Sequence, residues 1–316
     1  MRAVKFTGYG GPDVLDVVKV PRPAGGPGQV VVAVVTAATN PGEIGIREGH
    51  FADIWPAHFP EGQGNDFAGY VAEIGSGVDD FAVGDAVVGF APRAAQAEYV
   101  ALSVDAVAAK PPGLSWEAAA TIAGAGATAW ASVTAVNPQP GETIVVSAAA
   151  GGVGIYAAQL ARLRGADVIG TCGPANVDLL SSLGIRPAQY GAGLSRRLRD
   201  LAPNGIDGYI DTFGSGDVSL AVGLGVQPHR INTLIDQEAV QRFGVHSDAQ
   251  EQADTPLIWA ELADLVARKS ITVPIAAVYD FTTEQVRQAY RDVGTRHVSG
   301  KRVLRIMPAH QQNRHT

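Results

Sequence analysis

Residues 142–154 read Glu-Thr-Ile-Val-Val-Ser-Ala-Ala-Ala-Gly-Gly-Val-Gly, and this stretch determines the expected fold class. Its first six residues, with Ile144, Val145 and Val146 in succession, predict a buried strand. Residues 153–164 carry apolar side chains at helical spacing, and Gly165 can end that helix. In a strand, glycine turn and helix of this kind, backbone N–H groups and the helix N-terminus can approach a pyrophosphate.

We therefore assign the turn to cofactor binding. The dinucleotide motif G-x-G-x-x-G is present only as a shifted variant, so the glycines could instead serve only to permit a tight turn. The strand and the helix on either side favour phosphate contact. The cofactor-binding residues expected here are Ala150, Gly151, Gly152, Val153 and Gly154.

The rest of the chain shows two patterns of residues. Up to residue 113, short β-branched runs separated by Gly and Pro turns predict strands at 14–20, 30–35, 70–74, 86–90 and 98–102. From Gly141 strands alternate with helices, which indicates βαβ units and a parallel sheet. Further helices are expected at 259–269 and 283–293, and further strands at 275–279 and 301–307.

Composition limits the possible partners. With 316 residues and 46% hydrophobic content the chain can hold two domains. Its net charge of -7, with no basic run longer than Arg196-Arg197, speaks against nucleic acid or an anionic membrane as partner and for a small-molecule substrate. The single cysteine, Cys172, excludes an intrachain disulfide and a thiolate-rich zinc site, which fits a reducing cytoplasm. Met1 to Phe6 do not resemble a secretory signal, so export is not expected.

An uncharged stretch, 118–136, has the length of a membrane span. It consists mostly of small residues, so its transfer into lipid would be poorly favourable. We expect a buried, closely packed helix there.

The end of the second parallel strand bears on the choice of cofactor. This strand, expected at 166–170, should end beside the adenosine ribose, where NAD-specific proteins place Asp or Glu. Thr171, Cys172 and Gly173 follow instead and leave room for a 2′-phosphate. The expected cofactor is NADPH.

Taken together, the segments from Met1 to Ile306 resemble the zinc-free quinone oxidoreductases (zeta-crystallin-like) of the medium-chain dehydrogenase/reductase superfamily. The collinear matching segments are 10–15, 40–43, 64–69, 83–85, 97–100, 126–130, the glycine turn, 210–214 and 300–304.

The resemblance implies a fold of the α/β class in two domains. A GroES-like catalytic domain is expected at 1–120, completed by 273–316. A doubly wound Rossmann domain that binds NADP is expected at 121–272, with the active site in the cleft. Relatives also suggest a homodimer.

The resemblance places Asn40 and Thr128 beside the nicotinamide, where Asn40 can donate a hydrogen bond to a developing oxyanion or to the carboxamide. From the residues alone, Asn40 could equally be a helix cap and Thr128 a packed helix residue. Tyr190 matches a tyrosine near the 2′-phosphate, whereas Asn176 stands where relatives often carry a basic residue.

No metal site is expected. Zinc-dependent relatives have a Cys near the position of Asn40 and a His beside the acid of the next motif, but this chain has Thr39, Asn40 and Asn65 there. Without zinc as a Lewis acid, alcohol oxidation is disfavoured. The expected chemistry is hydride transfer from NADPH to a quinone or an α,β-unsaturated carbonyl.

Several roles stay open. Asp66 and Glu43 could take part in proton transfer or form a structural hydrogen-bond network. Gly45 stands where several quinone reductases have a pocket tyrosine, which predicts a wider or differently shaped pocket. Phe51, Trp55 and Phe59 could line that pocket or simply pack in their loop.

Two other functions share these residues. One is an enoyl reductase acting on a polyketide or other secondary-metabolite intermediate. The other is a catalytically silent dinucleotide-binding protein, including an RNA-binding one, although the acidic net charge disfavours RNA.

Overall fold

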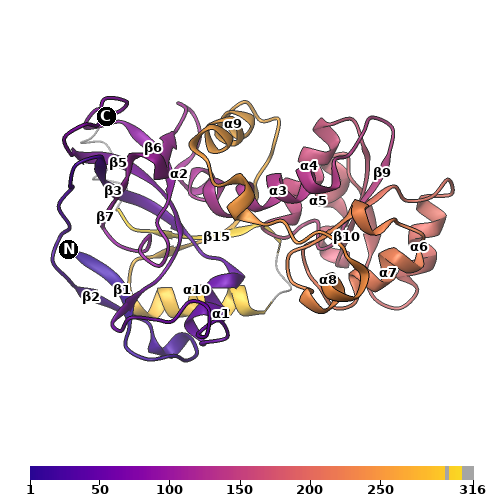
Figure 1. The fold of residues 1–316 in the computed structure, drawn as a ribbon, viewed down its shortest axis with the longest axis horizontal. Helices are drawn as coiled ribbons and strands as arrows, with labels where there is room; N and C mark the ends of the chain where they lie inside the picture. Colours follow the sequence, from indigo (N-terminus) through magenta and orange to yellow (C-terminus); the bar gives the residue numbers. More distant parts are fainter. Residues whose placement is uncertain (296–298, 308–316) are drawn as a thin grey trace. The chain divides into compact units, whose positions relative to one another are not determined.

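The computed structural model describes residues 1–295 and 299–307. The chain divides into two units (Figure 1). Unit 1 contains Met1–Gly124, Thr255–Arg268 and the described residues from Pro274 on, and unit 2 contains Ala125–Asp254 and Lys269–Val273. Helix α9 (Pro256–Ala267) lies in unit 1, whereas the expected boundaries put it in the nucleotide-binding domain. The reason is its packing against strands β6 and β8 of unit 1.

Unit 1 is built on two sheets. The smaller has the order β2 (Asp16–Lys19), β1 (Arg2–Phe6) and β4 (Glu61–Gly62). The larger has the order β14 (Ile275–Asp280), β15 (Lys301–Arg305), β3 (Gln29–Ala38), β5 (Asp66–Ile74), β6 (Ala86–Phe90) and β8 (Val107–Ala109), while β7 (Tyr99–Ser103) also pairs with β3. All pairs are antiparallel except β14 with β15. Strand β3 is a run of Val, Ala and Thr in which every residue after Gln29 is buried, as expected for a strand covered on both faces.

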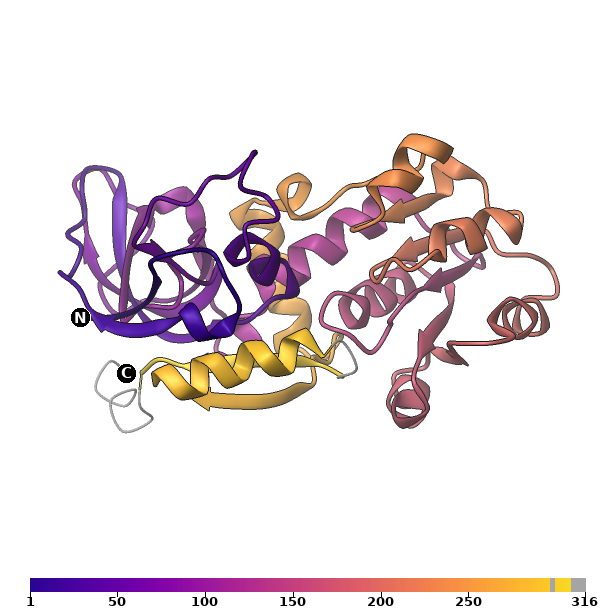
Figure 2. The same cartoon turned by 90° about the horizontal axis from the view of Figure 1, so that it is seen from below.

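Two helices of unit 1 position the residues discussed below. Helix α1 (Pro41–Arg47) follows β3 directly, and α10 (Thr283–Gly294) lies along β14 and β15 (Figure 2). The buried face of α10 is formed by Val286, Ala289 and Tyr290, and the Thr282 side chain caps its first turn. The helices predicted at 259–269 and 283–293 are confirmed, with ends shifted by up to three residues.

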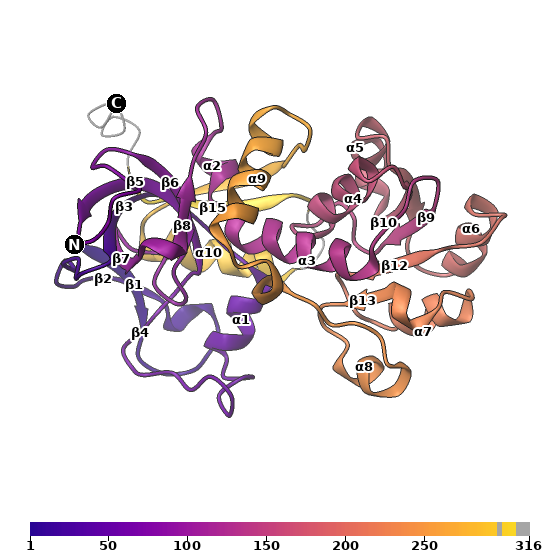
Figure 3. The ribbon, with the colours of Figure 1, turned by 45° about the horizontal axis from the view of Figure 1, so that its top comes forward.

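Unit 2 contains a five-stranded parallel sheet of order β11 (Arg186–Gln189), β10 (Asp167–Cys172), β9 (Thr143–Val146), β12 (Gly208–Asp211) and β13 (Ile231–Thr233). Helices α6 (Leu194–Leu201), α7 (Asp217–Gly223) and α8 (Gln237–Phe243) bury Leu198, Val218 and Ala239 in one cluster with sheet residues. Helix α3 (Ala127–Val136) contacts β12, and helix α4 (Gly154–Leu163) contacts β9 (Figure 3). Helix α5 (Val177–Ser182) comes before β11 in the chain. The strand order reverses between β9 and β12, where doubly wound sheets bind ligands. The predicted α/β class with a GroES-like and a Rossmann-like part is confirmed.

The uncharged stretch 118–136 is largely buried as expected, but the expectation of one continuous helix is wrong. It forms α2 (Trp116–Ala119), a π-helical turn at Ile122–Gly126 and then α3. Gly124 in this turn lies so close to the carboxylate of Asp66 that a Cβ atom on it would be 2.4 Å from Oδ2. The run of small residues is thus divided by a turn that lies against Asp66. None of the helices in the described part of the chain has the length and apolarity to cross a membrane.

Candidate functional site: a buried polar cluster and a glycine turn

Asn40 lies at the junction of β3 and α1, and its side chain is fully engaged. Its Nδ2 donates hydrogen bonds to Oδ1 of Asp66 at 2.6 Å and to Oε1 of Glu43 at 3.0 Å. Its Oδ1 accepts one from Nζ of Lys301. Both amide hydrogens of Asn40 are therefore occupied, and one lone pair on Oδ1 is left.

The local sequence explains where this side chain goes. Pro41 occupies the first position of α1, and the carboxylate of Glu43 accepts a hydrogen bond from the backbone amide of Asn40 at 3.1 Å, which is one half of a capping box. The Asn40 side chain makes no capping bond to the helix. Asn40 therefore caps the helix only through its backbone amide, which binds Glu43. Its side-chain amide can instead bind Asp66 and Lys301, which come from distant segments.

Glu43 is buried and accepts four hydrogen bonds. The donors are the backbone and side-chain nitrogens of Asn40, the Asn65 amide at 3.2 Å and the Tyr290 hydroxyl at 2.5 Å. Burial, together with the charge of Asp66, raises the pKa of Glu43 to about 7, and the hydrogen bonds oppose this rise. Four donors directed at one carboxylate support the structural-network alternative over proton transfer.

Lys301 is the cation of this cluster, and it is only 3% exposed. Besides Asn40, its ammonium contacts the Thr39 carbonyl oxygen at 3.3 Å. Burial lowers its pKa, and the charges of Asp66 and Glu43 oppose that change. Burial likewise raises the pKa of Asp66, against the influence of Lys301. We call Asn40, Glu43, Asp66, Tyr290 and Lys301 the polar cluster.

The polar cluster combines Asn40, which caps α1 at its start, with residues from α1, β5, α10 and β15. The hydroxyl of Tyr290 also accepts a hydrogen bond from Nε2 of Gln96 at 2.7 Å, and burial with the charge of Glu43 raises the pKa of Tyr290 well above its usual value. Sequence reasoning singled out Asn40, Glu43 and Asp66 but missed Lys301 and Tyr290. The available signal for Lys301 was weak, namely a lysine at the first position of a short strand that continues into Val303 and Leu304.

Thr128, the other expected catalytic residue, lies in the first turn of α3 in unit 2. Its carbonyl oxygen accepts a hydrogen bond from the Ser132 hydroxyl at 2.8 Å. Thr128 is half-buried. The proposal that it lies by the nicotinamide stays a prediction.

The glycine turn joins β9 to α4 as expected. Ala148 has a left-handed backbone with φ of 44°, and the turn closes through the Gly151 amide on the Ala148 oxygen at 2.8 Å. A Cβ atom on Gly154 would be 2.3 Å from the same oxygen, so this glycine is required by the turn itself. Within residues 1–295 and 299–307 no hydrogen bond uses the amides of Ala150, Gly152, Val153 or Gly154. These N–H groups are available to an anion.

Strand β10 extends two residues beyond its predicted end and includes Thr171 and Cys172. Both side chains are buried, and the Thr171 hydroxyl accepts a hydrogen bond from the Ala148 amide at 3.0 Å. Burial raises the pKa of the Cys172 thiol. Thr171 thus braces the glycine turn, and Cys172 packs in the interior of unit 2.

The three remaining residues that were expected beside the ribose lie together. A Cβ atom on Gly173 would be 3.1 Å from the Tyr190 hydroxyl, so the tyrosine ring lies against the Gly173 backbone. The Tyr190 amide donates to the Cys172 oxygen at 3.1 Å, and the Asn176 amide to the Gly173 oxygen at 3.0 Å. The Tyr190 ring itself is 53% exposed.

A buried carboxylate organises the carboxyl ends of three strands in unit 2. Asp211 accepts hydrogen bonds from the hydroxyls of Ser147 and Thr233 and from the Gly214 and Phe213 amides, at 2.8–3.0 Å. Ser147 follows β9, Asp211 ends β12 and Thr233 ends β13. This network holds in position the loops that follow β9 and β12, the two strands between which the strand order reverses.

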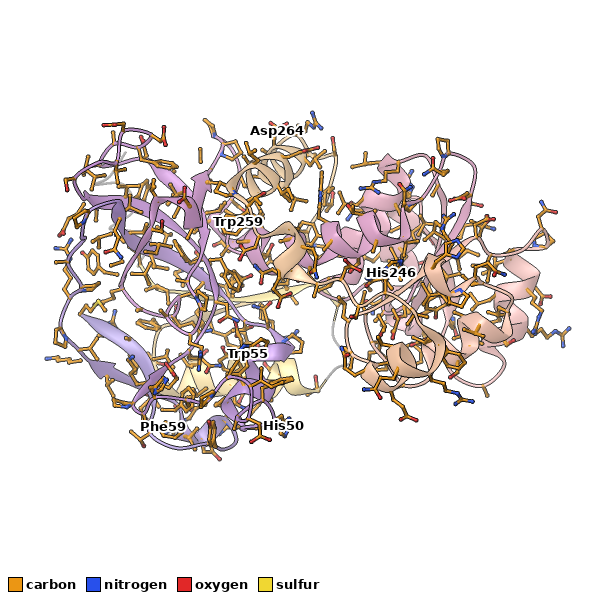
Figure 4. The ribbon with its side chains drawn as sticks, viewed as in Figure 1. His50, Trp55, Phe59, His246, Trp259 and Asp264 are labelled. Carbon is orange, nitrogen blue, oxygen red and sulfur yellow. The ribbon has the colours of Figure 1, made fainter. Side chains whose placement is uncertain are left out.

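The aromatic residues of the loop after α1 form two groups, and Figure 4 shows Trp55 of one and Phe59 of the other. Phe59 packs edge-on against Phe6 and Tyr9, with ring centroids 5.8 and 5.1 Å apart, which is ordinary loop packing. Phe51 pairs with Trp55 at 5.8 Å. A Cβ atom on Gly45 would be 2.9 Å from Cε2 of Phe51, so the space expected above Gly45 is occupied by this ring.

The described residues contain no group of three or more His, Cys, Asp or Glu side chains that could hold a metal ion.

Comparisons with known proteins agree with this architecture. The model of the alcohol dehydrogenase GroES-like domain matches residues 26–129. A chloroplastic quinone-oxidoreductase homolog of Spinacia oleracea is 34% identical over 194 residues, which is 58% of this chain and 59% of the relative. The polyketide synthase GfsB of Streptomyces halstedii is 42% identical over 164 residues, which is 50% of this chain and 3% of the synthase.

Solved structures match over nearly the whole chain. The quinone oxidoreductase of Coxiella burnetii is 26% identical with a TM-score of 0.84, covering 97% of this chain and 99% of the other. A mycobacterial protein solved in complex with NADPH is 25% identical with a TM-score of 0.85, covering 97% and 100%. The GroES-like unit and the doubly wound unit define a member of the medium-chain dehydrogenase/reductase superfamily. Within that superfamily the chain is similar to quinone oxidoreductases, and it spans 59% of the length of the spinach relative.

Proposed function

We propose that the protein is an oxidoreductase that uses NADPH to reduce a quinone or an α,β-unsaturated carbonyl without a metal ion. The observation that carries this proposal is the glycine turn with its unused amides at Ala150, Gly152, Val153 and Gly154. Relatives named as quinone oxidoreductases and a similar structure solved with NADPH support it.

The residues of unit 2 fit a dinucleotide. The four unused amides and the start of α4 suit a pyrophosphate, because they offer N–H donors and a partial positive charge. Gly173, Asn176 and Tyr190 would hold the ribose that carries the 2′-phosphate, and no acidic side chain stands among them to repel it. When bound, the cofactor supplies the hydride.

The role proposed for Asn40 follows from its hydrogen bonds. Both of its amide hydrogens are directed at carboxylates, so it cannot donate to an oxyanion in this arrangement. Its Oδ1 retains one lone pair, which can accept a hydrogen bond from the N–H of a carboxamide. We therefore assign Asn40 to orienting the nicotinamide ring, with Thr128 as the second contact of that ring.

A substrate panel tests the proposal. Benzoquinone, naphthoquinone and small enones are each incubated with NADPH and the protein, and the loss of reduced-nicotinamide absorbance is followed. We expect turnover of at least one acceptor and a modestly higher kcat/KM with NADPH than with NADH. A clear preference for NADH would contradict the cofactor assignment.

The second candidate is an enoyl reductase. It is favoured by the 42% identity to a segment of a polyketide synthase. A short enoyl thioester added to the same panel distinguishes the two, because an enoyl reductase should turn it over faster than any quinone. A protein that binds NADPH and reduces none of these compounds would instead be catalytically silent. The homodimer suggested by relatives is tested by light scattering of the purified protein.

A further inference from the structure

Arg197 on helix α6 is held by four backbone carbonyl groups. Its Nε donates to the Gln189 oxygen at 2.8 Å and its Nη1 to the Ala192 oxygen at 2.9 Å. Its Nη2 lies 3.2 Å from the Gly191 oxygen and 3.4 Å from that of Tyr190. One planar guanidinium thus fixes the whole loop 189–192 that follows β11.

Neighbouring arginines of α6 lack this arrangement. The side chain of Arg196 is 89% exposed and lies 3.7 Å from the Asp200 carboxylate. Arg199 donates to the Ser195 hydroxyl at 2.8 Å and is exposed. Only Arg197 of these three is half-buried and contacts the loop.

The positive charge of Arg197 is not neutralised by a carboxylate. Its partners are all neutral carbonyl oxygens, and no ion pair of Arg197 occurs in the described part of the chain. By contrast, Arg186 at the start of β11 is paired with Asp167, and Arg196 with Asp200. A held, uncompensated cation attracts an anion over several ångströms.

The loop that Arg197 fixes also carries Tyr190 onto Gly173. The ring lies against the Gly173 backbone at the carboxyl end of β10, next to Asn176. None of residues 173–176 or 189–193 is acidic. Sequence reasoning found no basic residue in the loop after β10, because Arg197 comes from helix α6, which follows α5 and β11 along the chain.

We infer that Arg197 determines the preference for a cofactor with a second phosphate on its adenosine ribose. This inference rests on the proposed function. A phosphate monoester carries a charge of about -1.5 to -2 at pH 7. For an assumed separation of roughly 8 Å in water-like surroundings, a fixed unit charge favours such a group over a hydroxyl by roughly fivefold.

The test compares three full-length variants, Arg197→Gln, Arg197→Lys and Arg196→Gln. Dissociation constants of NADPH and NADH are measured by fluorescence titration at low and high salt, and thermal melting confirms folding. We expect Arg197→Gln to weaken NADPH binding roughly fivefold and NADH binding less than twofold. The salt dependence of the NADPH preference should disappear in this variant, because it arises from the charge. Arg197→Lys keeps the charge and should keep most of the preference, and Arg196→Gln should behave as the wild type.

Three results would overturn the inference while leaving the proposed function intact. Arg197→Gln could weaken both dinucleotides equally, which would indicate a structural role. It could leave the ratio of the two dissociation constants unchanged. Arg197→Lys could behave like Arg197→Gln, which would show that the charge is not the cause. A wild-type protein that binds neither dinucleotide would instead refute the proposed function and this inference together.

Discussion

Lys301 is buried, and its surroundings show how one residue organises the polar cluster. Its ammonium holds Oδ1 of Asn40, and this contact directs the two amide hydrogens of Asn40 to Glu43 and Asp66. A neutral side chain at position 301 would leave the amide of Asn40 free to turn over, and the nearby carboxylates would lose their counter-charge. The orientation of the Asn40 amide and the charge balance of the two carboxylates therefore both depend on Nζ of Lys301.

We predict that Lys301→Met lowers the free energy of unfolding by up to about 3 kcal/mol, the lower end of the cost of breaking a buried ion pair, because Asn40 stands between the charges. The double variant Lys301→Met with Asp66→Asn should recover more than half of this loss. Urea unfolding measures both. The control is Lys110→Met, which removes a different lysine of unit 1 that is only partly buried. A double variant no more stable than Lys301→Met would show that charge balance is unimportant here.

Glu43 predicts a pH dependence of stability. Its pKa is raised from 4.5 to about 7 in the folded protein, so the folded state binds a proton more tightly than the unfolded state. The stabilisation from this proton is complete below pH 4.5 and is lost as the pH rises through about 7. Between these values, the free energy of unfolding of the wild type should fall more steeply with pH than that of Glu43→Gln.

Denaturant titrations at several pH values check this difference. Asp217, whose pKa burial raises to about 6, contributes with the same sign in both proteins and cancels in the comparison. Parallel curves for wild type and Glu43→Gln would mean that Glu43 stays ionised throughout, as its four hydrogen bonds favour.

At the scale of elements, the strand-turn-helix unit from β9 to α4 is held from outside. The Thr171 hydroxyl binds the Ala148 amide, and the Thr171 oxygen accepts the Ala149 amide at 2.9 Å. The end of β10 therefore positions the turn, while the amides of Ala150, Gly152, Val153 and Gly154 stay available. A preorganised set of donors of this kind binds an anion without the cost of ordering a loop.

We predict that Gly152→Val weakens dinucleotide binding at least a hundredfold, because a branched side chain would occupy the approach of the pyrophosphate. Isothermal titration with NADPH measures the effect. The control is Gly223→Val at the end of α7, where an added Cβ atom meets nothing within 4 Å. Unchanged affinity in Gly152→Val would remove the turn from the cofactor site.

At the scale of the whole molecule, the metal question can be tested directly. The positions that carry Cys and His in zinc-dependent relatives hold Asn40 and Asn65 here, and both amide hydrogens of Asn40 are bonded within the polar cluster. We predict less than a tenth of an equivalent of zinc per chain by elemental analysis and no loss of reductase activity in EDTA. Activity lost in EDTA and restored by zinc would contradict this prediction.

The amino-acid sequence by itself determined the class of the fold and the site of the glycine turn. The Ile144-Val145-Val146 run and the glycines after it are local signals, because hydrophobic periodicity and turn residues act over a few positions. The same holds for helices α9 and α10, whose apolar faces repeat at helical spacing. Asn40, Glu43 and Asp66 were singled out through the resemblance of their segments to a known family.

Only the tertiary structure decided how these residues are used. Lys301 and Tyr290 reach Asn40 and Glu43 from more than 240 positions away. Arg197 reaches back over the loop 191–193 to the carbonyl oxygen of Tyr190. The π-helical turn that contains Gly124 lies against Asp66, and it divides a stretch that local propensity would make one helix. Burial and partner geometry set the charge state of Glu43 and the orientation of Asn40, and both arise from packing between segments whose separation along the chain carries no local signal.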